Sequence, residues 1–128
     1  MARAHDLIVW GASGFTGRLV AEHLARHYSG AGAAAPVRWA MAGRDRAKLE
    51  AVRAELAATL PAAADVPILT ADLSDESGLD AVIGSAKVVL TLAGPYAKHG
   101  GAVVASAVRT RTDYADITGA SRVTAQSP

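Results

Sequence analysis

The sequence predicts an α/β domain, a doubly wound parallel sheet of five strands in the order 3-2-1-4-5 with helices on both faces. Short apolar runs alternate with segments of helical period from one end of the 128-residue chain to the other. One of those runs, VVLTLA, is apolar nearly throughout, as strands buried on both faces are. Three glycines spaced by three follow the first run, in IVWGASGFTG. In this strand order a ligand is expected at the switch between strands 1 and 4.

The first half of the chain begins with a strand, a helix and a second strand. Residues 7–10 are a short apolar run and predict the first strand. Residues 15–28 predict a helix because apolar side chains recur on roughly one side of it: Leu19, Val20, Leu24 and Tyr28. Residues 29–36, SGAGAAAP, predict a loop, because glycine and proline interrupt regular structure there. The apolar residues 37–42 predict the second strand.

A second helix is expected to start at Asp45, whose side chain suits an N-cap. Apolar residues then recur at spacings of three and four: Leu49, Val52, Leu56 and Leu60. The third strand is expected at residues 66–71, and a short helix, weakened by Gly78, within residues 74–86.

The last third of the chain repeats the alternation. Residues 87–93 predict the fourth strand, residues 101–109 a helix, and residues 114–117 the fifth strand. Helices therefore connect parallel strands throughout.

Composition excludes several classes of function. A formal net charge of +1 does not indicate a nucleic-acid partner, which would require a basic stripe. The absence of cysteine excludes disulfides and cysteine-zinc sites. The apolar runs stop well short of the roughly 20 residues that a membrane span needs, and no signal peptide precedes the first strand. A cytoplasmic protein is the resulting expectation.

The three glycines lie where a strand gives way to a helix. In such a turn Gly11 permits the sharp change of direction, Gly14 lets the backbone approach a pyrophosphate, and Gly17 lets the helix pack close to the sheet. The helix N-terminus offers free N–H groups and partial positive charge to phosphates. The spacing is G-x-x-G-x-x-G rather than G-x-G-x-x-G. The alternative is that the glycines serve turn geometry alone.

The end of the second strand is expected to contact the adenosine ribose. Arg44 stands there, and a guanidinium suits a 2′-phosphate by charge and geometry, which favours NADP over NAD. Lys48, one turn into the next helix, is a candidate for a second positive charge. The alternative is that both are ordinary surface cations. Asp45 has two possible roles, a ribose contact or the helix cap, and we favour the cap.

Asp72 and Leu73 follow the third strand, where the adenine edge lies in this fold. The alternative of equal weight is that Asp72 or Ser74 only caps the short helix.

The switch point itself carries the segment TLAGPYAKHGG. Gly94 and Pro95 force a turn there, and Tyr96 is a candidate to present its hydroxyl to the nicotinamide end, unless it packs over the turn. Lys98 and His99 are expected to be solvated.

Other functional patterns are incomplete. His23 and His27 have the i, i+4 spacing of metal ligands, but no third ligand is evident, so no metal site is predicted. The sequence lacks the phosphate-loop motif of ATPases, and it lacks the Tyr-x-x-x-Lys pair of common short-chain reductases. No catalytic residue is assigned.

Taken together, the motifs resemble those of saccharopine dehydrogenase-like oxidoreductases, in particular the actinobacterial subgroup that includes trans-acting enoyl reductases. The matching blocks are GASGFTGRLVAEHL, WAMAGRDRAKLE, ADLSDESGLDAV, VVLTLAGPYAKHGGAVVASAV and TDYADITG, and the resemblance covers residues 6 to about 119.

The resemblance implies a Rossmann domain that binds NADP, or alternatively NAD, as part of an enzyme that transfers hydride to a C=N or C=C bond. It carries the following residues to the phosphates: Gly11, Ser13, Gly14, Phe15, Thr16 and Gly17. It also carries Arg44 to the ribose, Asp72 to the adenine, and residues 94–96 to the switch point.

The end of the sequence departs from this family. Relatives usually have Glu after Asp-(Ile/Leu)-Thr-Gly and then a large second domain, whereas Ala120 stands here. We therefore expect a cofactor domain over residues 1–119, a polar tail over residues 120–128, and no substrate domain. The alternative function is a non-catalytic dinucleotide-binding or redox-sensing module. An uncovered fifth strand at the sheet edge predicts a homo-oligomer.

Overall fold

The computed structural model describes residues 3–29, 36–91 and 100–116. Its five strands are parallel and lie in the predicted order β3-β2-β1-β4-β5. They are β1 (His5–Trp10), β2 (Trp39–Gly43), β3 (Ile68–Thr70), β4 (Ala86–Thr91) and β5 (Asp113–Asp116). The helices are α1 (Phe15–His27), α2 (Arg46–Thr59), the 3₁₀ helix η1 (Pro61–Asp65), α3 (Glu76–Ile83) and α4 (Gly100–Thr110). The predicted Rossmann-type fold is confirmed.

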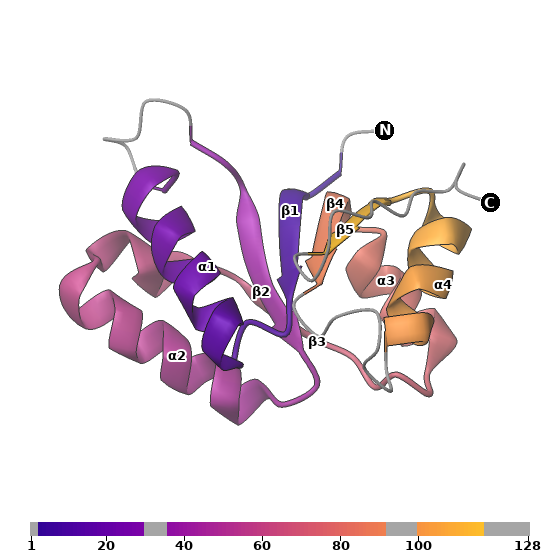
Figure 1. The fold of residues 1–128 in the computed structure, drawn as a ribbon, viewed down its shortest axis with the longest axis horizontal. Helices are drawn as coiled ribbons and strands as arrows, with labels where there is room; N and C mark the ends of the chain where they lie inside the picture. Colours follow the sequence, from indigo (N-terminus) through magenta and orange to yellow (C-terminus); the bar gives the residue numbers. More distant parts are fainter. Residues whose placement is uncertain (1–2, 30–35, 92–99, 117–128) are drawn as a thin grey trace.

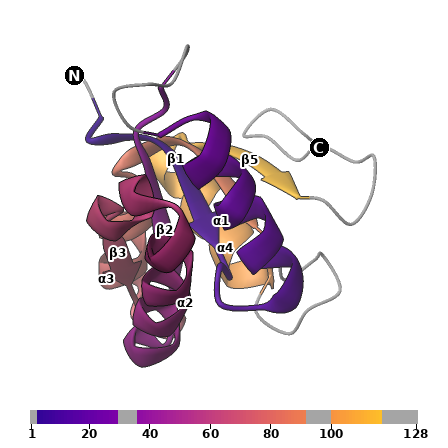
Figure 2. The same ribbon diagram turned by 90° about the vertical axis from the view of Figure 1, so that its left-hand side faces the viewer.

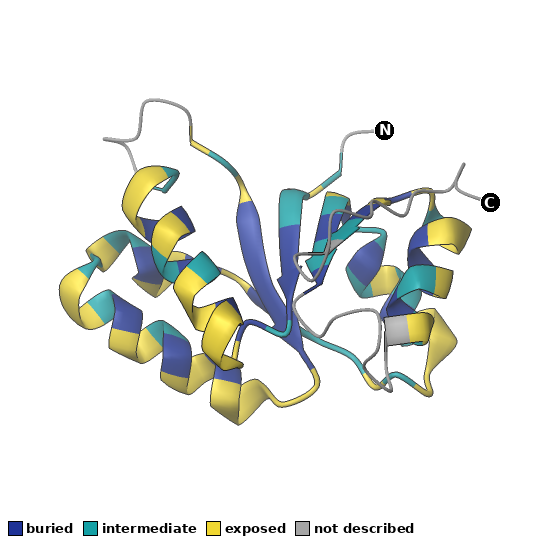
Figure 3. Cartoon of the chain, viewed as in Figure 1, coloured by how far each residue is buried: buried dark blue, intermediate teal, exposed yellow. Residues whose placement is uncertain are grey.

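The sheet separates two layers of helices. Helices α1 and α2 cover one face, and α3 and α4 cover the other (Figure 1). Figure 2 shows the molecule from the side of α1 and α2. Each face has its own apolar cluster, because side chains alternate along a strand: Val9 of β1 belongs to the cluster under α1 and α2, and Ile8 and Trp10 belong to the cluster under α3 and α4. Burial is concentrated in the strands and the inner sides of the helices (Figure 3).

Helix α1 packs through most of the predicted face, because Leu24 is buried and Val20 and Tyr28 pack against the cluster under α1 and α2, but Leu19 is an exception. Leu19 is 52% exposed, whereas the buried residues of the helix are Gly17, Ala21, Leu24 and Ala25. Small residues let the helix lie close to the sheet, so the contact face is turned toward glycine and alanine and away from Leu19.

Two strands are shorter than the sequence predicts. Strand β2 begins at Trp39 because the Val37 N–H donates to Tyr28 O at 2.8 Å instead of joining the ladder. Strand β3 begins only after Pro67, which has no N–H to donate. Residues 61–65 form η1, whose end precedes that proline.

The two helix caps differ in how well they were predicted. Asp45 caps α2 as expected, because its Oδ1 accepts from Lys48 N at 3.2 Å. The expectation that Asp72 or Ser74 caps the short helix is wrong. The cap of α3 is Asp75, whose Oδ1 accepts from Gly78 N at 3.2 Å.

Arg3 ties the beginning of the chain to its last described strand. Its guanidinium donates to Ala86 O at 2.7 Å, Thr112 Oγ1 at 2.6 Å, Thr110 O at 2.9 Å and Arg111 O at 3.2 Å. These four bonds hold the turn before β5 against the start of β4.

Candidate cofactor site

The carboxyl ends of the strands meet at one edge of the sheet. Because the strands are parallel, the register places Trp10 beside Ala42 and Thr91, and Gly43 beside Thr70. The segments that follow β1, β2 and β3 therefore emerge together. These segments carry most of the residues that the sequence assigns to the cofactor.

The turn after β1 is built by two glycines with different tasks. Gly11 has φ 90°, a left-handed conformation that side chains disfavour, and its N–H donates to Ala42 O at 2.8 Å. Gly14 N–H closes the turn on Gly11 O at 3.1 Å. Gly11 is thus required by the geometry of the turn itself.

Gly14 has no such conformational reason to be glycine. Its φ of −77° and ψ of 170° are extended values open to any residue. Among the residues that the structure describes, a Cβ at this position would meet only Gly11 O, at an ordinary 3.5 Å. The packing of these residues leaves the space open, as a ligand approaching the backbone would require.

The N-terminus of α1 is open to a ligand. Gly14 is its N-cap and supplies no side-chain hydrogen bond, and the first turn carries no acidic residue. The first-turn N–H groups of Phe15, Thr16 and Gly17 precede the first intrahelical bond, which Arg18 N donates to Gly14 O at 2.9 Å. Ser13, Phe15 and Thr16 are exposed, and Phe15 is 83% exposed. Within the described part of the chain these N–H groups have no acceptor, and the helix end adds partial positive charge.

The segment after β2 contributes Arg44. This exposed residue directly follows Gly43 and lines a pocket of about 510 Å³. Among the described residues Arg44 makes no ion pair. Lys48 is exposed on α2 and is not one of the described residues that line this pocket.

The segment after β3 brings Asp72 into the same pocket. Its Oδ1 accepts from Ser74 N at 2.9 Å and from Ser74 Oγ at 2.8 Å. These two bonds, and to a smaller extent the charge of Arg44, lower the pKa of the Asp72 carboxyl below its ordinary value. Leu73 instead packs against the cluster under α3 and α4 and does not line the pocket.

Four residues of this pocket were not predicted as site residues: Thr70, Ala71, Asp75 and Gly78. Thr70 ends β3, Ala71 follows it, and the other two belong to the start of α3. The predicted switch-point residues Gly94, Pro95 and Tyr96 lie outside the described residues, as do Lys98, His99 and residues 120–128.

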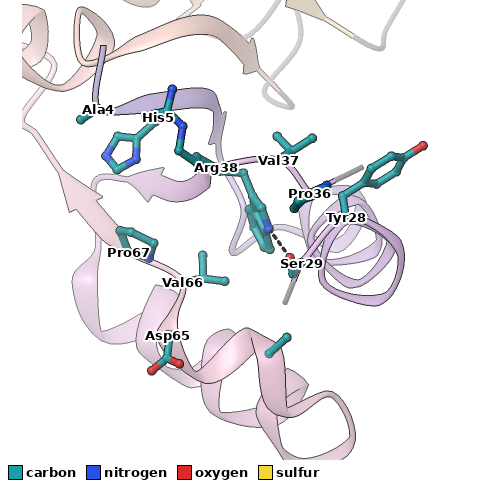
Figure 4. Close-up of a pocket in the computed structure, with 12 residues that line it drawn as sticks. Ala4, His5, Tyr28, Ser29, Pro36, Val37, Arg38, Asp65, Val66 and Pro67 are labelled. Atoms are coloured by element: carbon teal, nitrogen blue, oxygen red, sulfur yellow. Dashed lines mark hydrogen bonds between the residues drawn. The ribbon is translucent and has the colours of Figure 1, made fainter. Parts of the chain in front are cut away.

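A second pocket, of about 350 Å³, lies at the opposite, amino end of the strands (Figure 4). Trp39 forms part of its wall, and the indole Nε1 donates to Ser29 Oγ at 2.7 Å, the dashed line in the figure. His5 also lines it, and burial lowers the pKa of this imidazole. None of the predicted cofactor residues lies here.

The described part of the chain has neither a metal-binding cluster nor a membrane-spanning helix. His23 and His27 have ring centroids 4.7 Å apart, but no group of three His, Cys, Asp or Glu side chains gathers there. None of its helices has the length and apolar character needed to cross a bilayer.

Sequence comparison relates the chain to known proteins. The chain is 48% identical over 117 residues to a trans-acting enoyl reductase of Mycobacterium leprae and 45% identical to one of Mycobacterium tuberculosis. Each alignment covers 91% of this chain but 26% of the relative, so the chain spans about a quarter of the length of these relatives.

Solved structures show the same fold. The apo saccharopine dehydrogenase (L-Glu forming) of Saccharomyces cerevisiae superposes with a TM-score of 0.63 at 25% identity, covering 91% of this chain and 22% of that one. The triphenylmethane reductase of Citrobacter sp., complexed with NADP(H), gives a TM-score of 0.63 at 19% identity, covering 87% of this chain and 36% of that one. The protein-family model for the saccharopine dehydrogenase NADP-binding domain matches residues 7–127 of the sequence. The chain therefore belongs to the saccharopine dehydrogenase NADP-binding domain family, and its cofactor is NADP.

Proposed function

We propose that this chain binds NADP(H) along the carboxyl edge of its sheet and forms the cofactor-binding part of a hydride-transfer oxidoreductase. The pyrophosphate would lie against the turn from Gly11 to Gly17, the 2′-phosphate against Arg44, and the adenosine near Asp72. The observation that carries the proposal is the open space at Gly14 beside an uncapped helix N-terminus.

The residues at this edge supply what a dinucleotide phosphate needs. The first-turn N–H groups of α1 are donors for the pyrophosphate oxygens, and the helix dipole favours their negative charge. The Arg44 guanidinium, which makes no ion pair with the described residues, adds a positive charge one strand away. The Asp72 carboxylate, kept ionised by Ser74, accepts hydrogen bonds from amino or hydroxyl groups.

Bound NADP(H) supplies or accepts the hydride, and the protein binds and orients it. Reduction of a C=C bond is supported by the enoyl reductase name of the curated relatives, and a C=N bond is the alternative that the family resemblance implies. A non-catalytic dinucleotide-binding module would use the same site, so the binding experiment tests what the two functions share.

The test is Gly14→Val, with NADPH binding measured by calorimetry. The branched side chain has an allowed backbone conformation but occupies the space proposed for the pyrophosphate. We expect affinity to fall more than tenfold, a loss of at least about 1.4 kcal/mol. Stability should fall by less than about 1 kcal/mol, because valine is only a poorer N-cap than glycine.

Ala58→Val is the matched control. Ala58 is exposed in the last turn of α2, away from the carboxyl edge of the sheet, so the variant introduces the same branched side chain at a distance from the proposed site. This variant should bind NADPH as the wild type does. Equal affinities for Gly14→Val and the wild type would refute the proposed phosphate site.

A further inference from the structure

The pocket at Arg44 is less positive than a 2′-phosphate site would be expected to be. Its charged lining consists of Arg44, Asp72 and Asp75, one cation and two carboxylates among the described residues. The 2′-phosphate of NADP is itself negative, so the carboxylates oppose the attraction that Arg44 provides. The two carboxylates differ in their surroundings.

Asp75 is fixed in this wall by the start of α3. Its Oδ1 accepts from Gly78 N and from Ser77 Oγ, each at 3.2 Å. Its Oδ2 lies 2.5 Å from the ideal position of a Cβ on Gly78, too close for a side chain there. The missing side chain of Gly78 thus makes room for the carboxylate, which is held in the wall rather than swinging freely into solvent.

A charge held in this way acts on any ligand that shares the pocket. Arg44 and Asp75 line the same pocket of about 510 Å³, and charges that share a pocket are only partly screened, because the Debye length is roughly 8 Å at physiological ionic strength. NADH carries a neutral hydroxyl at the position of the 2′-phosphate, so a fixed carboxylate penalises NADPH more than NADH.

We propose that Asp75 is a specificity-determining residue that weakens binding of the 2′-phosphate and so limits the preference of this chain for NADPH over NADH. The inference rests on the proposed function, because it places the 2′-phosphate at Arg44. The helix cap alone does not require the charge, since asparagine and serine cap helices about as well as aspartate.

The experiment compares Asp75→Asn and Asp75→Ser with the wild-type chain. Both variants keep a capping side chain and remove the negative charge. Calorimetry measures binding of 2′,5′-ADP and of 5′-AMP, which differ only in the 2′-phosphate, and then of NADPH and NADH. We expect 2′,5′-ADP and NADPH to bind roughly two- to fivefold more tightly to both variants, and 5′-AMP and NADH to change much less.

Salt provides a second readout that a purely structural effect would not reproduce. The gain for 2′,5′-ADP should be largest at an ionic strength of about 0.01 M and should nearly vanish at about 1 M, where the Debye length is about 3 Å. The control is Asp65→Asn, which makes the same change in net charge at the amino end of the sheet. Its effect on 2′,5′-ADP binding should be negligible.

The outcomes separate this inference from the proposed function. Unchanged 2′,5′-ADP affinity in both Asp75 variants, with a normal effect of Gly14→Val on NADPH, would overturn the role of Asp75 alone. A gain equal for 2′,5′-ADP and 5′-AMP, or equal to that of Asp65→Asn, would also overturn it. Failure of the wild type and the variants to bind NADPH would overturn both proposals.

Discussion

Replacing Arg44 with alanine should remove most of the preference for NADPH over NADH. In the structure this guanidinium lies at the end of β2, lines the pocket beside Asp72, and makes no ion pair within the described part of the chain. It is therefore available to a 2′-phosphate without first breaking another interaction. NADH has no charge at that position and gains little from Arg44.

The size of the effect follows from the exposure of the site. A hydrogen bond to a charged group contributes about 1.5–3 kcal/mol, or roughly ten- to a hundredfold in affinity. Arg44 is exposed to solvent, and two carboxylates share its pocket, so we expect a contribution at the lower end of this energy range. We expect Arg44→Ala to weaken NADPH binding about tenfold and NADH binding less than about twofold.

The assay is calorimetric titration of both cofactors into the wild type, Arg44→Ala and Arg26→Ala. Arg26 is an exposed cation in the last turn of α1, far from the phosphate turn, and it pairs with Glu22 at 3.4 Å, so its removal matches the change in net charge. The control variant should retain the preference of the wild type. Wild-type chain that binds NADH more tightly than NADPH, or Arg44→Ala that keeps the preference, would refute the assignment of the 2′-phosphate to Arg44.

Three further predictions concern stability and assembly. Arg3→Ala should lower the free energy of unfolding by about 2 kcal/mol and increase the rate of amide hydrogen exchange in β5, because four hydrogen bonds around the turn before that strand are lost. An unchanged denaturation midpoint would contradict this prediction. Hydrogen bonds from Arg38, and to a smaller extent from Lys87, lower the pKa of Asp6 in the folded chain. The ionised carboxylate therefore adds about 1 kcal/mol to the free energy of unfolding above about pH 4, and this stabilisation is lost as the pH falls further. Denaturation measured between pH 5 and pH 2 should show the loss in the wild type and not in Asp6→Asn. Strand β5 lies at the sheet edge, so light scattering over a concentration series should show a homo-oligomer, and one monomeric mass at high concentration would exclude it.

The strand order could be predicted because alternation of strands and helices leaves few arrangements of a parallel sheet. The strand boundaries could not, because they depend on hydrogen bonds that the apolar pattern does not encode. Val37 continues the apolar run of β2, yet its N–H bonds to Tyr28 O at the end of α1. In the same way, Leu19 fits the helical period of α1 but stays exposed, because alanine and glycine allow a closer contact.

The candidate site was predictable as far as it depends on residues that directly follow strands, such as Arg44 and Asp72. Asp75 was missed because the sequence ADLSDES offers several side chains able to cap α3. The Asp75 N–H donates to Asp72 O at 3.0 Å, a turn that delays the helix until Glu76 and gives the cap to the later residue. Choosing between such neighbours requires the path of the backbone.

The three glycines of the first turn are equivalent in the sequence motif but not in the structure. Gly11 is required by its left-handed backbone, and Gly17 is buried on the inner side of α1. A larger residue at either position would disturb the fold, so loss of binding there would not identify a ligand site. Gly14 alone has an ordinary conformation and free space around it. Its substitution therefore separates the two interpretations of the motif, because turn geometry tolerates a side chain at this position and a bound pyrophosphate does not.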